Sequence, residues 1–232
     1  MEICSRTGSG KFSRLRRPWI SSLAVAASVV SCAGIAWAQA PSDDASSDGI
    51  DALDRFLDTV HSFSADFEQE VWDADQTLVE TSVGTVSLKR PDRFRWTYMT
   101  PYEQIVLSDG RRLWMYDVDL KQATVTSLDE LGTTSPAMLL SGDESVRDGF
   151  EEQSFVRDGM PWVRLRPRVS DPEFREVSIR FAAGLPDVVE FVNGLDQTTR
   201  ITFSAAVVNP VLDDRLFEFH RPRGVDVLGD EG

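Results

Sequence analysis

The sequence predicts an α+β fold in which a single strongly curved antiparallel sheet contains most of the chain. Three observations predict it. Only one long stretch, residues 50–60, has apolar residues at helical spacing, whereas polar and apolar residues alternate with the period of a β-strand through most of residues 63–207. Turn pairs such as Asp109-Gly110, Asp158-Gly159 and Asn193-Gly194 separate the strands. About ten short strands joined by hairpins in one layer curl or close on themselves, which predicts the curvature.

Residues 1–38 have the pattern of a secretory signal peptide. Basic residues precede an apolar run from Trp19 to Ile35, and the run ends in Ala36-Trp37-Ala38, whose small residues suit a signal peptidase. We expect cleavage after Ala38 or after Ala40, and export. A retained membrane anchor is the alternative, but serines and a glycine interrupt the run, which is short for a spanning helix.

Both cysteines, Cys4 and Cys32, lie within this leader, so cleavage would leave a chain without thiols or disulfides. Another interpretation stays open at this point. Val29-Val30-Ser31-Cys32 is similar to a lipobox, in which Cys32 would be acylated and would become the N-terminus. The better-formed site at residues 36–38 favours a soluble product.

The charge of the mature chain makes nucleic acid a poor partner. Loss of the leader removes five of 24 basic and one of 38 acidic residues, which leaves a formal net charge of −18. Residues 39–49 are polar and are expected to form a disordered lead-in. Residues 50–232 have the size of one domain.

Two segments are predicted to be helical. In the first, Ile50, Leu53, Phe56, Leu57 and Val60 fall on one face, with Ser47 or Asp48 placed to cap about three turns. The second is the short apolar segment Ser135–Leu140, in which Pro136 suits a first helical turn, Ser135 or Thr134 can cap it and Gly142 can end it. A small apolar helix midway through a sheet protein is well placed to plug the mouth of the sheet.

Between and beyond these helices, eleven segments alternate as half-buried strands do. They are residues 63–68, 83–89, 94–99, 104–107, 113–116, 122–126, 152–156, 162–166, 176–181, 188–192 and 200–207. A further short strand is expected at residues 217–219.

The chain lacks the usual signs of catalysis, so we expect no enzyme, no cofactor and no metal. Its two histidines, His61 and His220, are far apart in sequence, and no metal-ligand, nucleophile-elbow, phosphate-loop or dinucleotide motif occurs. The paired carboxylates lie in expected loops or at strand edges, where solvated charge is common. A hydrolase that uses these loop carboxylates is the alternative.

One run of short motifs is more specific than the periodicity. It comprises Lys89-Arg90-Pro91-Asp92-Arg93-Phe94-Arg95-Trp96, then Pro101, Gln104-Ile105-Val106, Ser108-Asp109-Gly110, Leu113-Trp114-Met115-Tyr116-Asp117 and Leu120-Lys121-Gln122. Phe63-Ser64-Ala65-Asp66-Phe67-Glu68-Gln69, the segment Ser135–Leu140 and the ending from Phe217 to Val225 belong to the same pattern. From Ile50 to the C-terminus, the chain resembles the outer-membrane lipoprotein carrier (LolA) family.

The resemblance implies an incompletely closed antiparallel β-barrel with a helical lid, located in the periplasm. In such a protein, an apolar cavity takes lipoprotein acyl chains from an inner-membrane ABC transporter and delivers them to an outer-membrane receptor. The arginine of the Lys-Arg-Pro motif, here Arg90, would hold the lid shut through hydrogen bonds to backbone groups of the lid. Phe94 would line the entry to the cavity. We expect a monomer.

The expected acyl-chain site is a set of apolar residues on the sheet and its helices. An acyl chain needs such a surface, because each buried methylene is worth about 0.8 kcal/mol. The set comprises Phe56, Phe94, Trp96, Leu113, Trp114, Met138, Leu139 and Leu140. These residues could equally form an ordinary core, and Arg90 could be an ordinary charge at a strand edge. An outer-membrane receptor of the same fold, acylated at Cys32, and a periplasmic lipid-sensing regulator are the alternative functions.

Overall fold

The computed structural model describes residues 48–128, 140–141, 144–169 and 175–229. All of them belong to the compact unit Pro41–Gly232. The predicted signal peptide, the lead-in, Cys32 and the lid residues 135–139 lie outside the described residues.

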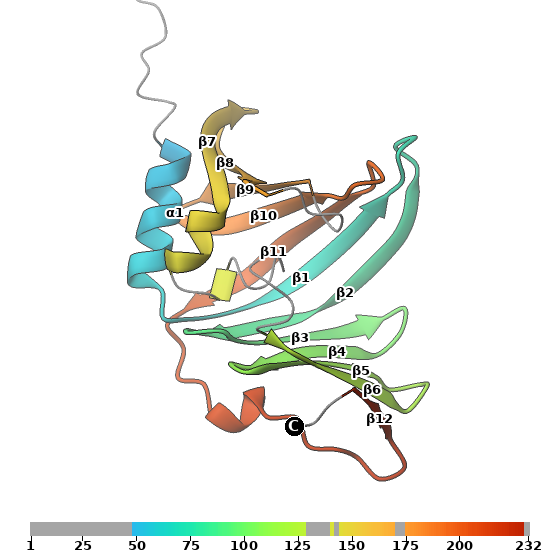
Figure 1. The fold of residues 1–232 in the computed structure, drawn as a ribbon. Coiled ribbons are helices and arrows are strands. Elements are labelled where there is room, and N and C mark those ends of the chain that lie inside the picture. The colour runs from blue at the N-terminus through green and yellow to red at the C-terminus, as the bar shows by residue number, and fades with distance from the viewer. Residues whose placement is uncertain (1–47, 129–139, 142–143, 170–174, 230–232) are drawn as a thin grey trace, which may run out of the picture. The chain divides into compact units, whose positions relative to one another are not determined.

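The predicted first helix is confirmed as α1 (Asp48–Thr59), which packs against β7, β8 and β9 (Figure 1). Its apolar face buries Leu53 and Phe56. The start of the helix lies very close to β8, since a Cβ added to Gly49 would come within 2.1 Å of the carbonyl oxygen of Trp162. The backbone N–H of Ile50 also donates to Oγ of Ser154 at 2.9 Å. A residue without a side chain at position 49 therefore lets the helix lie directly on the sheet.

Within the described residues, twelve strands follow in one sheet, and all eleven of the alternating segments predicted between residues 63 and 207 are confirmed as strands. The strands are β1 (Ser62–Trp72), β2 (Leu78–Lys89), β3 (Arg93–Thr100), β4 (Gln104–Asp109), β5 (Arg112–Asp117), β6 (Gln122–Ser127), β7 (Phe150–Arg157), β8 (Met160–Pro167), β9 (Glu176–Ala182), β10 (Leu185–Val192), β11 (Thr198–Val208) and β12 (Asp226–Leu228). A 3-10 helix, η3 (Glu144–Gly149), leads into β7.

The sheet is open, as predicted. Its strand order is β12-β6-β5-β4-β3-β2-β1-β11-β10-β9-β8-β7, so β1 joins the two halves by pairing with both β2 and β11. Neighbouring strands are antiparallel except for β12 and β6. In the part of the chain that the structure describes, no ladder joins β7 to β12. The long strands of the centre bend strongly, as Figure 1 shows.

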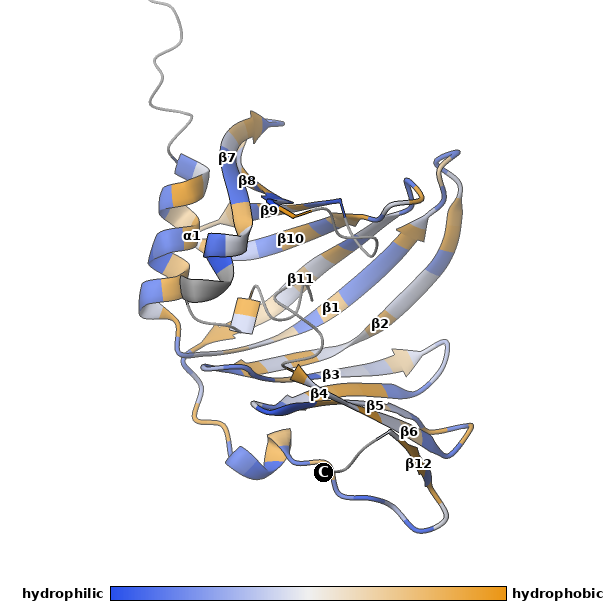
Figure 2. Ribbon diagram, viewed as in Figure 1, coloured by the Kyte–Doolittle hydropathy of each residue, from blue (hydrophilic) through white to orange (hydrophobic). Residues whose placement is uncertain are grey.

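The two faces of the sheet have different covers. We call the face that α1 packs against the inner face; it carries the main apolar cluster. The opposite, outer face of β4–β6 carries two smaller clusters, and these are covered by the C-terminal segment, residues 213–227. Apolar and polar residues alternate along the strands accordingly (Figure 2). The alternation that predicted the strands thus directs side chains of neighbouring residues to opposite faces, one covered by α1 and the other by the C-terminal segment.

The C-terminal segment differs from the prediction. The strand expected at residues 217–219 is wrong, because residues 214–217 form a 3-10 helix, η4, that begins where the Asp213 side chain accepts a hydrogen bond from the Arg215 N–H. A strand that was not predicted, β12, lies beside β6 in parallel. Three residues are too few for a recognisable alternation, and a parallel partner far away in sequence leaves no hairpin signal.

Candidate functional site

The inner face carries a continuous apolar surface across the middle of the sheet. Cross-strand pairing aligns its side chains in rows, because residues directly opposite each other project from the same face. The row nearest the end of α1 contains Phe63, Leu88 and Phe94, and the next contains Ala65, Val86 and Trp96. All six are buried.

An aromatic cluster extends this surface away from the helix. The ring of Phe67 lies 4.9 Å from Trp96 and 5.1 Å from Tyr98, both edge to face, and Phe203 of β11 lies 5.9 Å from Trp96. Gly84 is opposite Phe67, and an added Cβ would come within 2.8 Å of its ring. The glycine therefore leaves the space that the phenylalanine ring occupies.

Five of the residues expected to bind acyl chains meet on this inner surface. Phe56 of α1 lies 6.1 Å from Phe63, while Phe94 and Trp96 are 1% and 7% exposed. Leu113 is partly buried against the same cluster. Leu140 also joins it, as a fully buried side chain. Met138 and Leu139 lie outside the described residues.

Trp114 is not part of this surface. Successive residues of β5 alternate between the faces, so Leu113 on the inner face places Trp114 on the outer one. There its ring stacks on Phe219 of the C-terminal segment at 4.5 Å, next to Leu107 and Val125. The grouping of Trp114 with Trp96 and Leu113 was therefore wrong, because the aromatic motif alone does not show which of two neighbours faces inward.

Arg90 lies at the C-terminal end of α1. Its Nε donates to the carbonyl oxygen of Val60 at 2.7 Å, and its guanidinium carbon lies 5.3 Å from the centre of the Phe56 ring. Burial lowers the pKa of Arg90 to about 10, although the charge of Asp92 opposes that effect. The group is thus cationic at neutral pH. The expected bonds to the lid involve residues outside the described ranges, so the latch stays a prediction.

The inner surface ends in polar groups at the side away from α1. Tyr98 donates its hydroxyl hydrogen to Oε1 of Gln69 at 3.1 Å, and Ser82 donates to Oε1 of Glu80 at 3.0 Å. Burial, followed by the charge of Glu80, raises the pKa of Tyr98 to about 12, so the phenol is protonated at neutral pH. The sequence analysis missed these residues. The break in the run Phe63, Ala65, Phe67 at Gln69 is the signal that could have shown them.

Comparison with known proteins identifies the relatives of this open sheet. The sequence profile described as outer membrane lipoprotein carrier protein LolA matches residues 58–220. The chain belongs to the LolA family.

The curated relatives agree with the family match. The outer-membrane lipoprotein carrier protein of Nitrosospira multiformis is 36% identical over 184 residues, which cover 78% of this chain and 89% of that protein. The one from Azotobacter vinelandii is 35% identical over 201 residues, 86% of this chain and 97% of that protein. A solved LolA superfamily protein from Nitrosomonas europaea covers 73% of this chain and 95% of its own at 13% identity and a TM-score of 0.44, which is too slight a similarity to support an argument about function.

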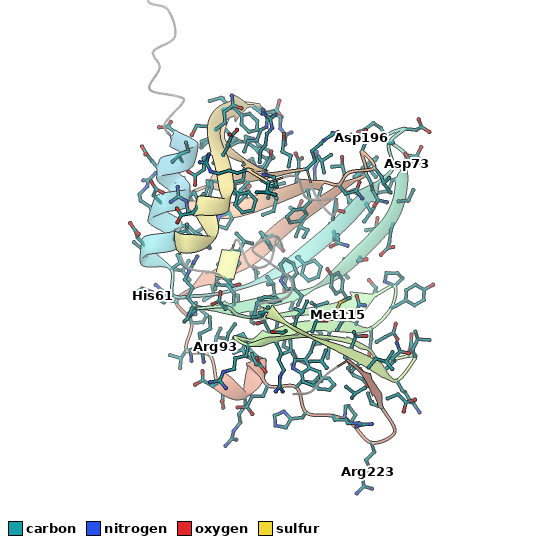
Figure 3. The ribbon with its side chains drawn as sticks, in the orientation of Figure 1. His61, Asp73, Arg93, Met115, Asp196 and Arg223 are labelled. Carbon is teal, nitrogen blue, oxygen red and sulfur yellow. The ribbon has the colours of Figure 1, made fainter. Side chains whose placement is uncertain are left out.

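In this member of the LolA family, the turn between β2 and β3 contacts both covers of the sheet. On the inner side, the N–H of Asp92 donates to the carbonyl oxygen of Ser141, just beyond the predicted lid, at 3.0 Å. On the outer side, Lys89 and Arg93 bind the carboxylate of Asp214 in η4 at 2.5 and 2.9 Å. These bonds, that of Lys89 foremost, lower the pKa of Asp214. Figure 3 shows Arg93 and His61 at this end of the sheet, and Asp73 and Asp196 at hairpin tips at the other.

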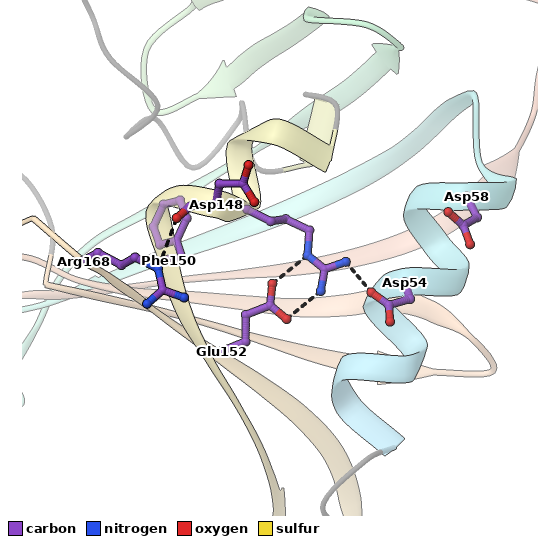
Figure 4. Close-up of a pocket in the computed structure, with 7 residues that line it drawn as sticks. Asp54, Asp58, Asp148, Phe150, Glu152 and Arg168 are labelled. Carbon is purple, nitrogen blue, oxygen red and sulfur yellow. Dashed lines mark hydrogen bonds and ion pairs between the residues drawn. The ribbon is translucent and has the colours of Figure 1, made fainter.

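A separate polar pocket lies between α1, η3 and β7 (Figure 4). Arg147 is at its centre, where Nε and Nη2 donate to the two carboxylate oxygens of Glu152 at 2.6 and 2.5 Å and Nη1 donates to Asp54. Asp58, Asp148, Phe150 and Arg168 complete the lining. The arginine fastens η3 to both neighbours, and the pocket contains none of the predicted acyl-chain residues.

Two further findings concern the described ranges alone. None of their helices combines the length and the apolar character needed to cross a bilayer. Nor do His, Cys, Asp or Glu side chains gather there in threes as candidate metal ligands.

Proposed function

We propose that this protein is a periplasmic carrier that shields the acyl chains of lipoproteins on its inner face and does no catalysis. The observation that best supports the proposal is the continuous apolar inner surface of an open sheet, from Phe63 to the aromatic cluster at Phe67. Curated members of the LolA family carry the name outer-membrane lipoprotein carrier protein. A non-directional apolar surface suits cargo whose protein part varies while its acyl chains do not.

The proposed acyl-chain site comprises Phe56, Phe94, Trp96, Leu113 and Leu140, all of which belong to or pack against the inner apolar cluster. Met138 and Leu139 of the proposed lid, which lie outside the described residues, are included from the sequence pattern. Trp114 is excluded by its position on the outer face. The described members of this set pack on one another, so loading must replace their mutual contacts with contacts to the chains.

The open sheet suits such an exchange. A closed barrel would have to break strand pairing to widen, whereas β7 and β12 are not paired with each other in the described structure. Arg90 is proposed to hold the lid shut through a few hydrogen bonds, each worth about 1.5–3 kcal/mol for a charged donor. An inner-membrane ABC transporter would supply the lipoprotein, and an outer-membrane receptor would receive it.

The direct test of the proposal is whether the protein purified from the periplasm carries triacylated lipoprotein, detected by mass spectrometry. A variant must then show that the inner face holds the cargo. Phe94→Glu would test folding and loading together, because Phe94 is 1% exposed. Met115 is better suited, since it is on the inner face, opposite Val106 and in the row of Trp96, and is 44% exposed.

Met115→Glu should lower loading about tenfold or more, because an acyl chain would desolvate the new carboxylate. The matched control is Val207→Glu, on the outer face opposite Ser64 and 51% exposed, which should load like the wild type. Equal loading of both variants, or periplasmic protein free of lipoprotein, would show that the inner face does not bind acyl chains.

A further inference from the structure

The inner face changes from apolar to polar within one row of the sheet. Phe67 ends the aromatic cluster, and the next inward residue of β1 is Gln69, which lies between Ile201 of β11 and Ser82 of β2. Ser82 is only 3% exposed, although its neighbour Glu80 is exposed. A set of polar side chains thus borders the proposed acyl-chain surface.

Some hydrogen-bonding groups of this set are bonded to each other, and others are available to a ligand. The Oε1 atom of Gln69 accepts from Tyr98, and the Ser82 hydroxyl donates to Glu80. Within the described ranges, Nε2 of Gln69 donates to no other group, so its two N–H bonds are available to a ligand. Tyr98 also retains lone pairs, and its phenol stays protonated at neutral pH.

We propose that Gln69, Tyr98, Ser82 and Glu80 form a subsite for the neutral ester and amide carbonyls through which acyl chains are attached. The proposal rests on the proposed carrier function and specifies its ligand. A chain that lies along Trp96 and Phe67 brings its first carbonyl to the row of Gln69, because the rows follow one another along β1. A carbonyl oxygen is an acceptor only, which is what the free Nε2 donors require.

Glu80 gives the subsite its selectivity. Its carboxylate accepts a hydrogen bond from the Ser82 hydroxyl at 3.0 Å, and Ser82 is directly opposite Gln69. A ligand that ends in a carboxylate or phosphodiester would place a second negative charge beside it, whereas an ester or amide would not. The subsite therefore favours the neutral linkages of an acylated N-terminus over a free fatty acid or an anionic phospholipid, which offer the same chain.

The test is competition against the neutral apolar probe N-phenyl-1-naphthylamine, with three competitors that share a twelve-carbon chain. They are monolauroylglycerol (a neutral ester), laurate (a carboxylate) and lauroyl-lysophosphatidylglycerol (an ester beside a phosphodiester). The wild type should bind the first most tightly. Gln69→Leu should weaken monolauroylglycerol about two- to tenfold, the value of one hydrogen bond, without weakening the probe.

Glu80→Gln should tighten laurate and the phospholipid about fivefold, by removing a like charge near the surface. The matched control is Glu68→Gln, on the outer face of neighbouring β1, which should change nothing. If Gln69→Leu weakens probe and ester equally, or if Glu80→Gln and Glu68→Gln behave alike, the subsite is overturned while the carrier function stands. If the wild type does not bind the probe, both proposals fail.

Discussion

Arg90 combines a buried position with a charge that it keeps. It lies against the Phe56 ring and the carbonyl oxygen of Val60, yet its pKa of about 10 leaves it cationic at neutral pH. A guanidinium presents several donors in a fixed fork, so one side chain can hold Val60 and a second backbone acceptor at once. Arg90 can therefore bind the backbone of a second segment that lies next to α1, as the proposed latch requires.

Replacing Arg90 should therefore separate loading from release. Arg90→Leu loses the bond to Val60 and the proposed bonds to the lid, so the open state becomes more common, and it should accept lipoprotein but retain it. Arg90→Lys should be partly active, because an ammonium can keep one or two of the bonds. The measurement is paired, with loading from inner-membrane vesicles followed by transfer to receptor. If Arg90→Leu loads poorly but transfers normally what it holds, Arg90 belongs to the loading surface instead.

At this scale, the sequence predicted which apolar side chains are buried better than which face of the sheet they occupy. Phe94, Trp96 and Leu113 are on the inner face as expected, but Trp114 is on the other side. The direction of a strand side chain depends on the register of pairing, and a slip by one residue exchanges the faces. Gln69 was overlooked because only a break in the apolar run Phe63, Ala65, Phe67 marks its inward position.

Among the elements, the C-terminal segment contributes most beyond the predicted strands. It crosses the outer face of β4–β6, buries Phe217 and Val225, and ends in β12 along the edge of β6. Phe219 is the central contact, with its ring stacked on Trp114 and 5.8 Å from Tyr116. The segment thereby covers both the apolar outer face and an edge that could otherwise pair with another chain.

Phe219→Ala should loosen this cover. The lost ring contacts alone are worth about 0.5–1.5 kcal/mol, and the free energy of unfolding in urea should fall by at least that amount. Trp114 should become accessible, so acrylamide should quench more of the tryptophan fluorescence. His220→Ala, at the exposed neighbouring position, serves as control and should change neither quantity. Unchanged quenching in Phe219→Ala would mean that the stack does not shield Trp114.

The elements that could be predicted are those with enough length to show a period. Helix α1 and the eleven predicted strands are each long enough to repeat their spacing, so apolar burial fixes their type. In contrast, η4 depends on the side chain of Asp213, which caps it, and on the ion pairs of Asp214 with Lys89 and Arg93. Such local and long-range polar contacts leave no periodic trace in the sequence.

For the whole molecule, the open prediction is the start of the mature chain. Residues 1–38 have the pattern of a cleavable leader, and the carrier function requires release from the membrane. Intact-mass measurement on protein from the periplasm should give a chain that begins at Gln39 or Pro41, without acylation. A mass that corresponds to an acylated Cys32 would contradict this and would favour the receptor as the function.

The β2–β3 turn gives the two covers of the sheet a common anchor. Within five residues, Arg90 contacts Val60 after α1 and Asp92 contacts Ser141 after the predicted lid, while Lys89 and Arg93 bind η4 on the other side. The same short turn therefore binds both covers. We expect cargo in the proposed inner site to displace the inner cover and, through this turn, η4 on the back of the sheet, a surface outside that site.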